Sequence, residues 1–214
     1  MEINKDELNT GDILLFHHEN DCKTCYNCVF SCFTGLIEAC TESKYSHVAI
    51  IIRDPQFTNP PMKGLYVLES SFEDFPDAED HRYKFGVELE EFDKVIASAA
   101  PHETIYWRKL ICVRDALFYE KLAETHKMVY DKPYDIYPKD WIDALFHKKN
   151  ASNGHVTSRF FCSALVAFVY YQWGFLPYSV EWTLVTPKML GTESPDAYKL
   201  NFDGCIVNKE IQIA

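Results

Sequence analysis

The chain has 214 residues, of which 47% are hydrophobic, 25% charged and 15% aromatic, and these values are ordinary for a soluble globular protein with a substantial core. Its formal net charge of −11 opposes binding to a nucleic-acid backbone and mildly disfavours anionic membranes and polyanionic substrates. No run of the sequence approaches the roughly 18 consecutive apolar residues of a membrane-spanning helix.

The amino-terminal segment is polar and acidic, unlike a secretory signal, so we expect a cytoplasmic protein, or a virion-interior protein if the source is a virus. Thiols are kept reduced in the cytoplasm. The eight cysteines are therefore expected to be free thiols, metal ligands or acylation sites, and not a disulfide framework.

The first half of the chain predicts mainly strands and turns. Residues 11–16 indicate a short buried strand entered through a Gly-Asp turn. Residues 46–52 give the strongest strand signal, because five consecutive apolar residues follow the histidine. Residues 64–70 predict the next strand, which we expect to pair antiparallel with it. We further expect an acidic surface loop at residues 70–82 and strands at residues 87–92 and 104–113.

The second half of the chain predicts helices. Four apolar side chains of residues 115–130 fall on one side of a helix: Leu117, Leu122, Ala123 and Met128. Residues 161–173 predict an apolar helix that Gly174 ends. The sequence contains no internal repeat and no clear linker, so it predicts one α+β domain over residues 1–214. Short helices are also expected at residues 28–40 and 139–146, and a last strand at residues 205–207 or 211–213.

Cys162 lies at the start of the predicted apolar helix. The amino terminus of a helix carries partial positive charge and unpaired N–H groups, which stabilise a thiolate and can bind the oxyanion of a tetrahedral intermediate. Cys162 is therefore a candidate nucleophile. A buried structural thiol is the alternative, since free cysteine is among the most buried residue types.

Two residues on neighbouring predicted strands could complete a catalytic group. His47 begins a buried strand, which is a rigid mount for a general base. Glu69 ends the strand predicted beside it, where a carboxylate could fix the tautomer of the imidazole and stabilise imidazolium. For each residue alone, a structural or solvated side chain is the alternative.

Four short motifs follow one another along the chain. They are Gly11-Asp12-Ile13-Leu14, Tyr45-Ser46-His47-Val48-Ala49-Ile50, Val67-Leu68-Glu69-Ser70 and Phe161-Cys162-Ser163-Ala164-Leu165-Val166. This ordered set resembles the circularly permuted NlpC-type papain-like family, and is most similar to its YiiX-like and poxvirus branch, related to the lecithin–retinol acyltransferases. In ordinary papain-like enzymes the cysteine helix precedes the histidine strand, whereas in this branch, as here, it follows.

The resemblance spans residues 11 to about 175 and implies an antiparallel sheet packed against helices, one of which carries the nucleophile. It implies Cys162 as nucleophile, His47 as base and Glu69 as the third polar residue. Lys132-Pro133-Tyr134-Asp135 resembles the Pro-Tyr segment of NlpC-type enzymes, which makes Tyr134 a candidate hydroxyl donor near the oxyanion. A core tyrosine is the alternative, and a polar insert at residues 148–158 departs from the family and suggests a loop that shapes or covers the cleft.

A cluster of cysteines precedes the histidine strand: Cys22, Cys25, Cys28 and Cys32. Their spacing superficially copies a bacterial ferredoxin motif, but no proline follows Cys32. A zinc site completed by Cys40, His17 or His18 lacks a well-separated second ligand pair. S-acylation of this apolar segment, or reduced thiols packed on a helix, are the other interpretations.

The leading hypothesis is a thiol hydrolase (a cysteine peptidase or amidase) or an acyltransferase, acting on an amide or ester bond through a Cys162 thioester. No metal or organic cofactor is expected. Peptide, lipid and other acyl substrates stay open, as do peripheral membrane contact and the oligomeric state. The alternatives are a metal- or Fe–S-binding protein organised by the cysteine cluster, and a non-catalytic binding member of the fold.

Overall fold

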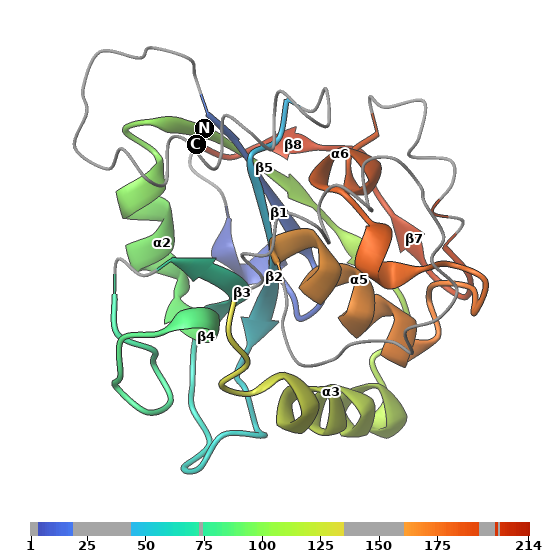
Figure 1. Cartoon of the computed structure of the whole chain (residues 1–214), viewed down its shortest axis with the longest axis horizontal. Coiled ribbons are helices and arrows are strands. Elements are labelled where there is room, and N and C mark those ends of the chain that lie inside the picture. Colours follow the sequence, from blue (N-terminus) through green and yellow to red (C-terminus); the bar gives the residue numbers. More distant parts are fainter. Residues whose placement is uncertain (1–3, 19–43, 73–74, 135–160, 193–199, 201) are drawn as a thin grey trace.

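The computed structural model describes residues 4–18, 44–72, 75–134, 161–192, 200 and 202–214 (Figure 1). Its strands are β1 (Ile13–His18), β2 (His47–Arg53), β3 (Leu65–Phe72), β4 (Phe85–Glu91), β5 (Glu103–Arg108), β6 (Leu110–Ile111), β7 (Ile206–Val207) and β8 (Ile211–Gln212). Its helices are α2 (Phe92–Ala99), α3 (Ala116–Val129), α5 (Cys162–Trp173) and α6 (Pro187–Leu190), with 3₁₀ turns at Lys5–Glu7 and Trp182–Leu184.

Within the described residues, six strands form one antiparallel sheet in the order β4-β3-β2-β1-β5-β8, and β6 pairs with β7 in a separate ribbon. The protein is therefore an α+β protein with an antiparallel sheet, as predicted. β2 lies near the middle of the sheet, and its residues 48–52 are all buried. A strand covered on both faces reads as a continuous apolar run, which explains why its sequence signal is strong.

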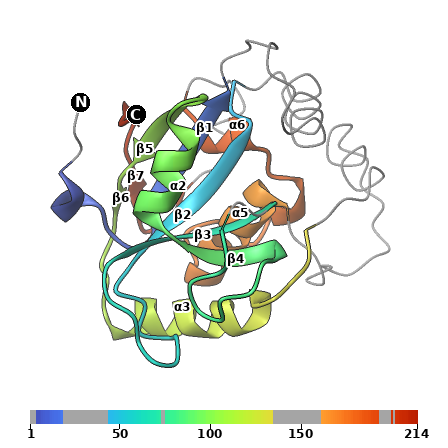
Figure 2. The ribbon, with the colours of Figure 1, turned by 90° about the vertical axis from the view of Figure 1, so that its left-hand side faces the viewer.

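Helices cover both faces of the sheet (Figures 1 and 2). On one face, α5 packs against β2 and β3, and α3 packs against α5. On the other face, α2 contributes Phe92 and Val95 to a second cluster that includes Ala49 and Ile51 of β2. The sheet is thus the middle of three layers, and each face of β2 contributes to a different core.

The helix α5 is buried along almost its whole length and ends at Gly174, which adopts a positive φ of 80°. A helix that is apolar on all sides must be enclosed on all sides. Here the sheet, α3 and the 3₁₀ turn Trp182–Leu184 enclose it. Each fully buried side chain such as Leu165 contributes about 1.5–3 kcal/mol to folding, so α5 is held firmly in place.

The structure corrects the buried face predicted for α3. Leu117 and Met128, predicted to share the inner side with Leu122, are 56% and 40% exposed. The inner side is formed instead by Phe118, Leu122, Thr125, His126 and Val129. The prediction was wrong because two of these residues, Thr125 and His126, are polar, which obscured the buried stripe at i, i+4, i+7, i+8 and i+11.

The acidic surface loop predicted at residues 70–82 is corrected in part, because residues 70–72 belong to β3 and one carboxylate of the segment that follows is buried. Asp77 is only 1% exposed, and its carboxylate accepts hydrogen bonds from Lys84 Nζ at 2.9 Å and from the Leu89 backbone N–H at 3.0 Å. A buried carboxylate needs such donors. The segment is therefore folded against β4, a tertiary contact that acidic composition does not reveal.

Other elements differ from expectation in smaller ways. The strand predicted at residues 104–113 is divided between β5 and β6, both of the alternative last strands form, and α2 was not predicted. The helices predicted at residues 28–40 and 139–146, and the insert at residues 148–158, lie outside the described residues. Among the helices in the described part of the chain, none combines the length and the apolar character needed to cross a membrane.

Candidate active site

His47 is the first residue of β2 and lies at one end of the strand. Its register partner on β1 is Phe16, whose ring packs against the imidazole with the ring centroids 5.2 Å apart. Ser46 anchors the same strand end, because its backbone N–H and its Oγ both donate to the Phe16 carbonyl, at 2.9 Å and 3.1 Å. Phe16, which the sequence interpretation did not single out, therefore helps to fix the ring.

Glu69 lies on β3, the strand beside β2, and its side chain is 5% exposed. Its Oε2 contacts Nε2 of His47 as a hydrogen-bonded ion pair. Since Glu69 occupies Nε2, the other ring nitrogen, Nδ1, is left to face a third group.

Cys162 is the first residue of α5 and is 2% exposed. Its sulfur is one of the groups that raise the pKa of the His47 imidazole. Phe161, the N-cap residue, makes no side-chain hydrogen bond to the first turn, and Ser163 Oγ holds that turn by donating to the Val185 carbonyl at 2.6 Å. The sulfur therefore lies at the amino terminus of a helix, where the first-turn N–H groups have no intrahelical acceptor.

The surroundings of His47 favour its charged form. Burial by itself lowers the pKa of the ring, but the Glu69 carboxylate and the Cys162 sulfur together raise that pKa well above 6.5. At neutral pH the ring therefore holds its proton between a carboxylate and a sulfur. A protonated imidazole is a charge state from which a proton can be donated.

The structure thus brings together three of the four residues predicted for the site, from β2, β3 and α5. His47 and Glu69 are 22 residues apart along the chain, and Cys162 is farther away. These intervals alone do not show that the three residues lie close together in the folded protein. Their catalytic roles stay predictions, which the geometry makes testable.

A second carboxylate near the site was missed in the sequence. Glu88 of β4 is the register partner of Glu69 and is 2% exposed, and Glu90 is 6% exposed. Directly opposed residues lie on the same side of an antiparallel sheet. The alternation of Val87, Glu88, Leu89 and Glu90 indicates a strand with one polar side, but it did not show that this side is buried.

Tyr134 lies in a short segment along the outer edge of β4. Its backbone N–H donates to the Phe85 carbonyl at 3.0 Å, and its ring stacks on the Phe85 ring with the centroids 5.3 Å apart. Both β3 and β4 separate this segment from β2, so its backbone is roughly 14 Å from β2 at about 4.8 Å per strand spacing. In the structure the Tyr134 side chain stacks on Phe85. Its role as a hydroxyl donor near the oxyanion stays a prediction.

No group of three or more histidine, cysteine, aspartate or glutamate side chains in the described residues is arranged to hold a metal ion. The cysteine cluster Cys22, Cys25, Cys28 and Cys32 lies outside those residues. The metal, Fe–S and acylation interpretations of the cluster therefore stay predictions.

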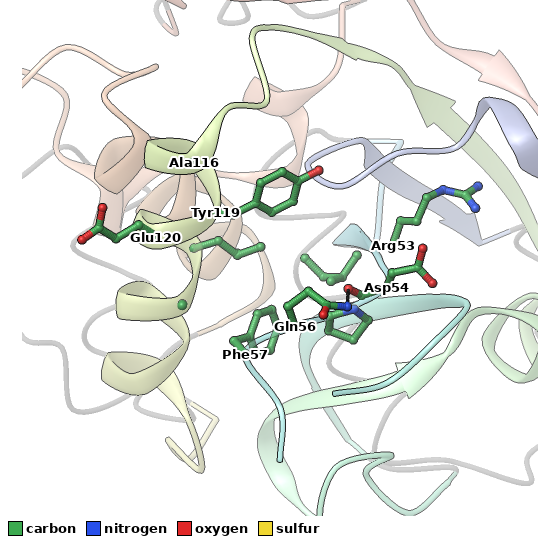
Figure 3. Close-up of a pocket in the computed structure, with 11 residues that line it drawn as sticks. Arg53, Asp54, Gln56, Phe57, Ala116, Tyr119 and Glu120 are labelled. Carbon is green, nitrogen blue, oxygen red and sulfur yellow. Dashed lines mark hydrogen bonds between the residues drawn. The ribbon is translucent and has the colours of Figure 1, made fainter. Parts of the chain in front are cut away.

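A cavity of about 320 Å³ lies between the loop that follows β2 and helix α3 (Figure 3). It is lined by residues 52–57 and by Ala116, Tyr119, Glu120, Leu122 and Ala123. This is the opposite end of β2 from His47, and neither Glu69 nor Cys162 lines the cavity. The cavity is therefore separate from the candidate active site.

No protein-family model and no curated protein sequence matches the chain. In three dimensions the chain is similar to the crystal structure of the metalloprotein YiiX from Escherichia coli O157:H7, with a TM-score of 0.45, 17% sequence identity and 97% of each chain covered. A likeness at this level carries no information about chemistry. The function has to be argued from the residues of this chain.

Proposed function

We propose that the chain is a cysteine hydrolase or acyltransferase that cleaves or transfers an acyl group at an amide or ester bond. The observation that carries this proposal is the ion pair between the Glu69 carboxylate and the His47 imidazole, whose pKa the Cys162 sulfur also raises. A nucleophile hydrogen-bonded to a base, which a third group orients, is the general arrangement for covalent acyl transfer.

The reaction begins with attack of the Cys162 sulfur on the carbonyl carbon of the substrate. The N–H groups of the first turn of α5 stabilise the oxyanion, and protonated His47 gives its proton to the departing amine or alcohol. The remaining thioester is cleaved by water in hydrolysis, or by an acceptor nucleophile in acyl transfer. His47 accepts the proton of the attacking group in that second step, and Glu69 stabilises the imidazolium throughout.

The alternative, a buried structural cysteine, does not account for the other two residues. Burying a histidine and a glutamate as a charged pair costs several kcal/mol per ion in desolvation, and an apolar pair of similar volume would pack as well. A strongly shifted titratable group beside a nucleophile is more characteristic of a functional site. The buried pair therefore supports catalysis over simple packing.

The order of the three residues along the chain supports the finer fold proposal. His47 and Glu69 precede Cys162, which is the reverse of the cysteine-first order of ordinary papain-like enzymes. An antiparallel sheet with the cysteine at the start of a packed helix agrees with a circularly permuted papain-like domain. We propose that fold for this chain.

The proposal is tested by the rate at which iodoacetamide alkylates Cys162 between pH 5 and pH 9. A tryptic peptide of residues 160–188 carries Cys162 as its one cysteine, so its labelling is followed by mass spectrometry. We expect rapid labelling at pH 6 in the wild type, and labelling slower by about tenfold or more in His47→Ala, because the imidazolium no longer stabilises the thiolate.

Two controls accompany this experiment. His102→Ala removes an exposed histidine and should leave the rate at Cys162 unchanged. Cys112, in the tryptic peptide of residues 110–114, should label alike in all three proteins. Equal labelling of Cys162 in wild type and His47→Ala would refute the proposal, whereas the expected loss justifies a screen of peptide, lipid and ester substrates.

A further inference from the structure

The ribbon of β6 and β7 brings together two cysteines that are far apart in the sequence. Its register pairs Leu110 with Val207 and Ile111 with Ile206. Continuing that register by one residue places Cys112 directly opposite Cys205. Both residues are free thiols of intermediate exposure.

The hydrogen-bonding pattern of the ribbon shows whether the two cysteines form a hydrogen-bonded or a non-hydrogen-bonded pair. Asn208 N–H donates to the Lys109 carbonyl at 2.9 Å, so Lys109 and Asn208 form a hydrogen-bonded pair. Because such pairs alternate along an antiparallel ladder, Cys112 and Cys205 occupy a non-hydrogen-bonded position. Opposed Cα atoms there are about 4.5 Å apart, which lies within the range that a disulfide spans.

Both thiols point inward. Their neighbours Ile111 and Ile206 are 47% and 62% exposed, and side chains alternate between the two sides of a strand. Cys112 and Cys205 accordingly pack against the main hydrophobic cluster. Burial, and after it the neighbouring Cys112, raises the pKa of Cys205 to about 12, which agrees with two thiols in close proximity.

The geometry points to Cys112 and Cys205 as the site of a reversible disulfide that cross-links β6 to β7. Burial, Asp12 and Asp115 raise the pKa of Cys112, and the Arg114 guanidinium opposes them. Either thiol can attack first, and the order in which Cys112 does so illustrates the chemistry. The sequence predicts free thiols, metal ligands or acylation sites and no disulfide framework, and this single cross-link forms only where an oxidant is supplied.

The oxidant is a small-molecule disulfide. The Cys112 sulfur attacks one of its sulfur atoms, and the other leaves as a thiol that takes up the proton of Cys112. The Cys205 sulfur then attacks the sulfur of Cys112, and the second small thiol leaves with the proton of Cys205. Two protein thiols are oxidised to one disulfide, and one small disulfide is reduced to two thiols.

The cross-link would close a long loop of chain, residues 112–205, which contains α3 and α5. Closing a long loop restricts the unfolded chain more than the folded one. We therefore expect the oxidised protein to unfold at a higher temperature. The site does not include Cys162, so this inference stands or falls independently of the proposed function.

The test treats the full chain with oxidised glutathione at pH 8, blocks the remaining thiols with iodoacetamide and maps the tryptic peptides without reduction. Cys112 lies in the peptide of residues 110–114 and Cys205 in that of residues 200–209, each with one cysteine. We expect these peptides joined and lighter by two hydrogens, and separated again by dithiothreitol. We also expect a rise in Tm of several degrees that Cys112→Ser and Cys205→Ser each abolish.

The mapping of the wild type decides the matter even if a serine variant folds poorly. Joined peptides that dithiothreitol separates support the inference. Glutathione adducts on both peptides without a link, full alkylation of both thiols, or a link from either one to another cysteine would each overturn it.

Discussion

At the scale of single residues, the negative charge of Glu69 determines the charge state of the candidate site, because it pairs with His47. A carboxylate that is 5% exposed costs several kcal/mol in lost hydration unless a positive partner compensates it. His47 is that partner, and the pair is oriented by adjoining strands and by the ring of Phe16. The same charge that the fold must compensate keeps the imidazole protonated beside Cys162.

This pairing predicts how stability depends on pH. Burial lowers the pKa of His47, but Glu69 and Cys162 raise it well above 6.5, so the folded-state pKa exceeds the unfolded one. The stabilisation is therefore fully present below about pH 6.5 and is lost as the pH rises through the folded-state pKa. In Glu69→Gln we expect the free energy of unfolding to fall by about 2–3 kcal/mol at pH 6, and by less at pH 9.

Urea unfolding from pH 6 to pH 9 measures this difference. Glu124→Gln makes the same chemical change at an exposed position of α3 and should alter the free energy of unfolding by less than about 0.5 kcal/mol at every pH. A loss in Glu69→Gln that is the same at all pH values would show that the carboxylate does not act through the charge of His47.

At the scale of elements, the outer edge of β4 depends on one glycine. Gly86 has a φ of 153°, and a Cβ atom there would lie 2.1 Å from the Lys132 carbonyl oxygen. That carbonyl accepts a hydrogen bond from the Val87 N–H at 2.8 Å, and Tyr134 N–H donates to Phe85. Only a residue without a side chain lets the segment that carries Tyr134 lie against the strand.

We therefore expect Gly86→Ala to detach this segment from β4 and to lower the free energy of unfolding by about 1–3 kcal/mol. Hydrogen exchange of the Val87 and Tyr134 amides reports the detachment. Gly64→Ala is the matched control, because Gly64 also has a positive φ, of 113°, but no atom lies within 4 Å of its Cβ position. If the two variants lose equal stability and protect both amides equally, the close approach at Gly86 is not important.

At the scale of the whole molecule, α5 is connected to the rest of the protein at both ends. At its start, the Cys162 sulfur helps to raise the pKa of His47 on β2. Near its end, Tyr170 donates from its hydroxyl to the Gly11 carbonyl at 2.6 Å. Through this bond, the predicted Gly-Asp turn before β1 is joined to α5, and Asp12 of the turn is fully buried.

Asp12 also holds together parts of the chain that are remote in sequence. Its carboxylate accepts hydrogen bonds from Trp107 Nε1 at 2.8 Å, from Leu110 N–H at 2.9 Å and from Asn9 N–H at 3.0 Å. Removing it would leave buried donors without an acceptor, each at a cost of about 1–3 kcal/mol.

We expect Asp12→Ala to lower the free energy of unfolding by about 3–5 kcal/mol, as measured by urea unfolding at pH 7. Asp6→Ala, at an exposed position, should change it by less than about 0.5 kcal/mol. A loss below about 1 kcal/mol in Asp12→Ala would show that water replaces the carboxylate and that the network is not central to the fold.

The sequence by itself determined the elements whose signals are local. Both faces of β2 are buried, so its sequence is a continuous apolar run after His47, and this run predicts the strand. The apolar run that starts at Cys162 predicts α5, and Gly174 marks its end. His47 and Cys162 could be named because each begins such an element, whereas Glu69, which was expected to end its strand, lies inside β3 because that strand continues to Phe72. The resemblance to a known family grouped the three residues into one candidate site, on the order of their motifs along the chain.

Only the tertiary structure decided which groups meet. The contact of Glu69 with His47 depends on the pairing of β3 with β2, and the burial of Glu88 depends on what covers the polar side of β4. The inner side of α3, the burial of Asp77 and the apposition of Cys112 with Cys205 are likewise set by contacts between remote segments. Local periodicity carries no information about such contacts, because they arise from the closure of long loops and the packing of layers.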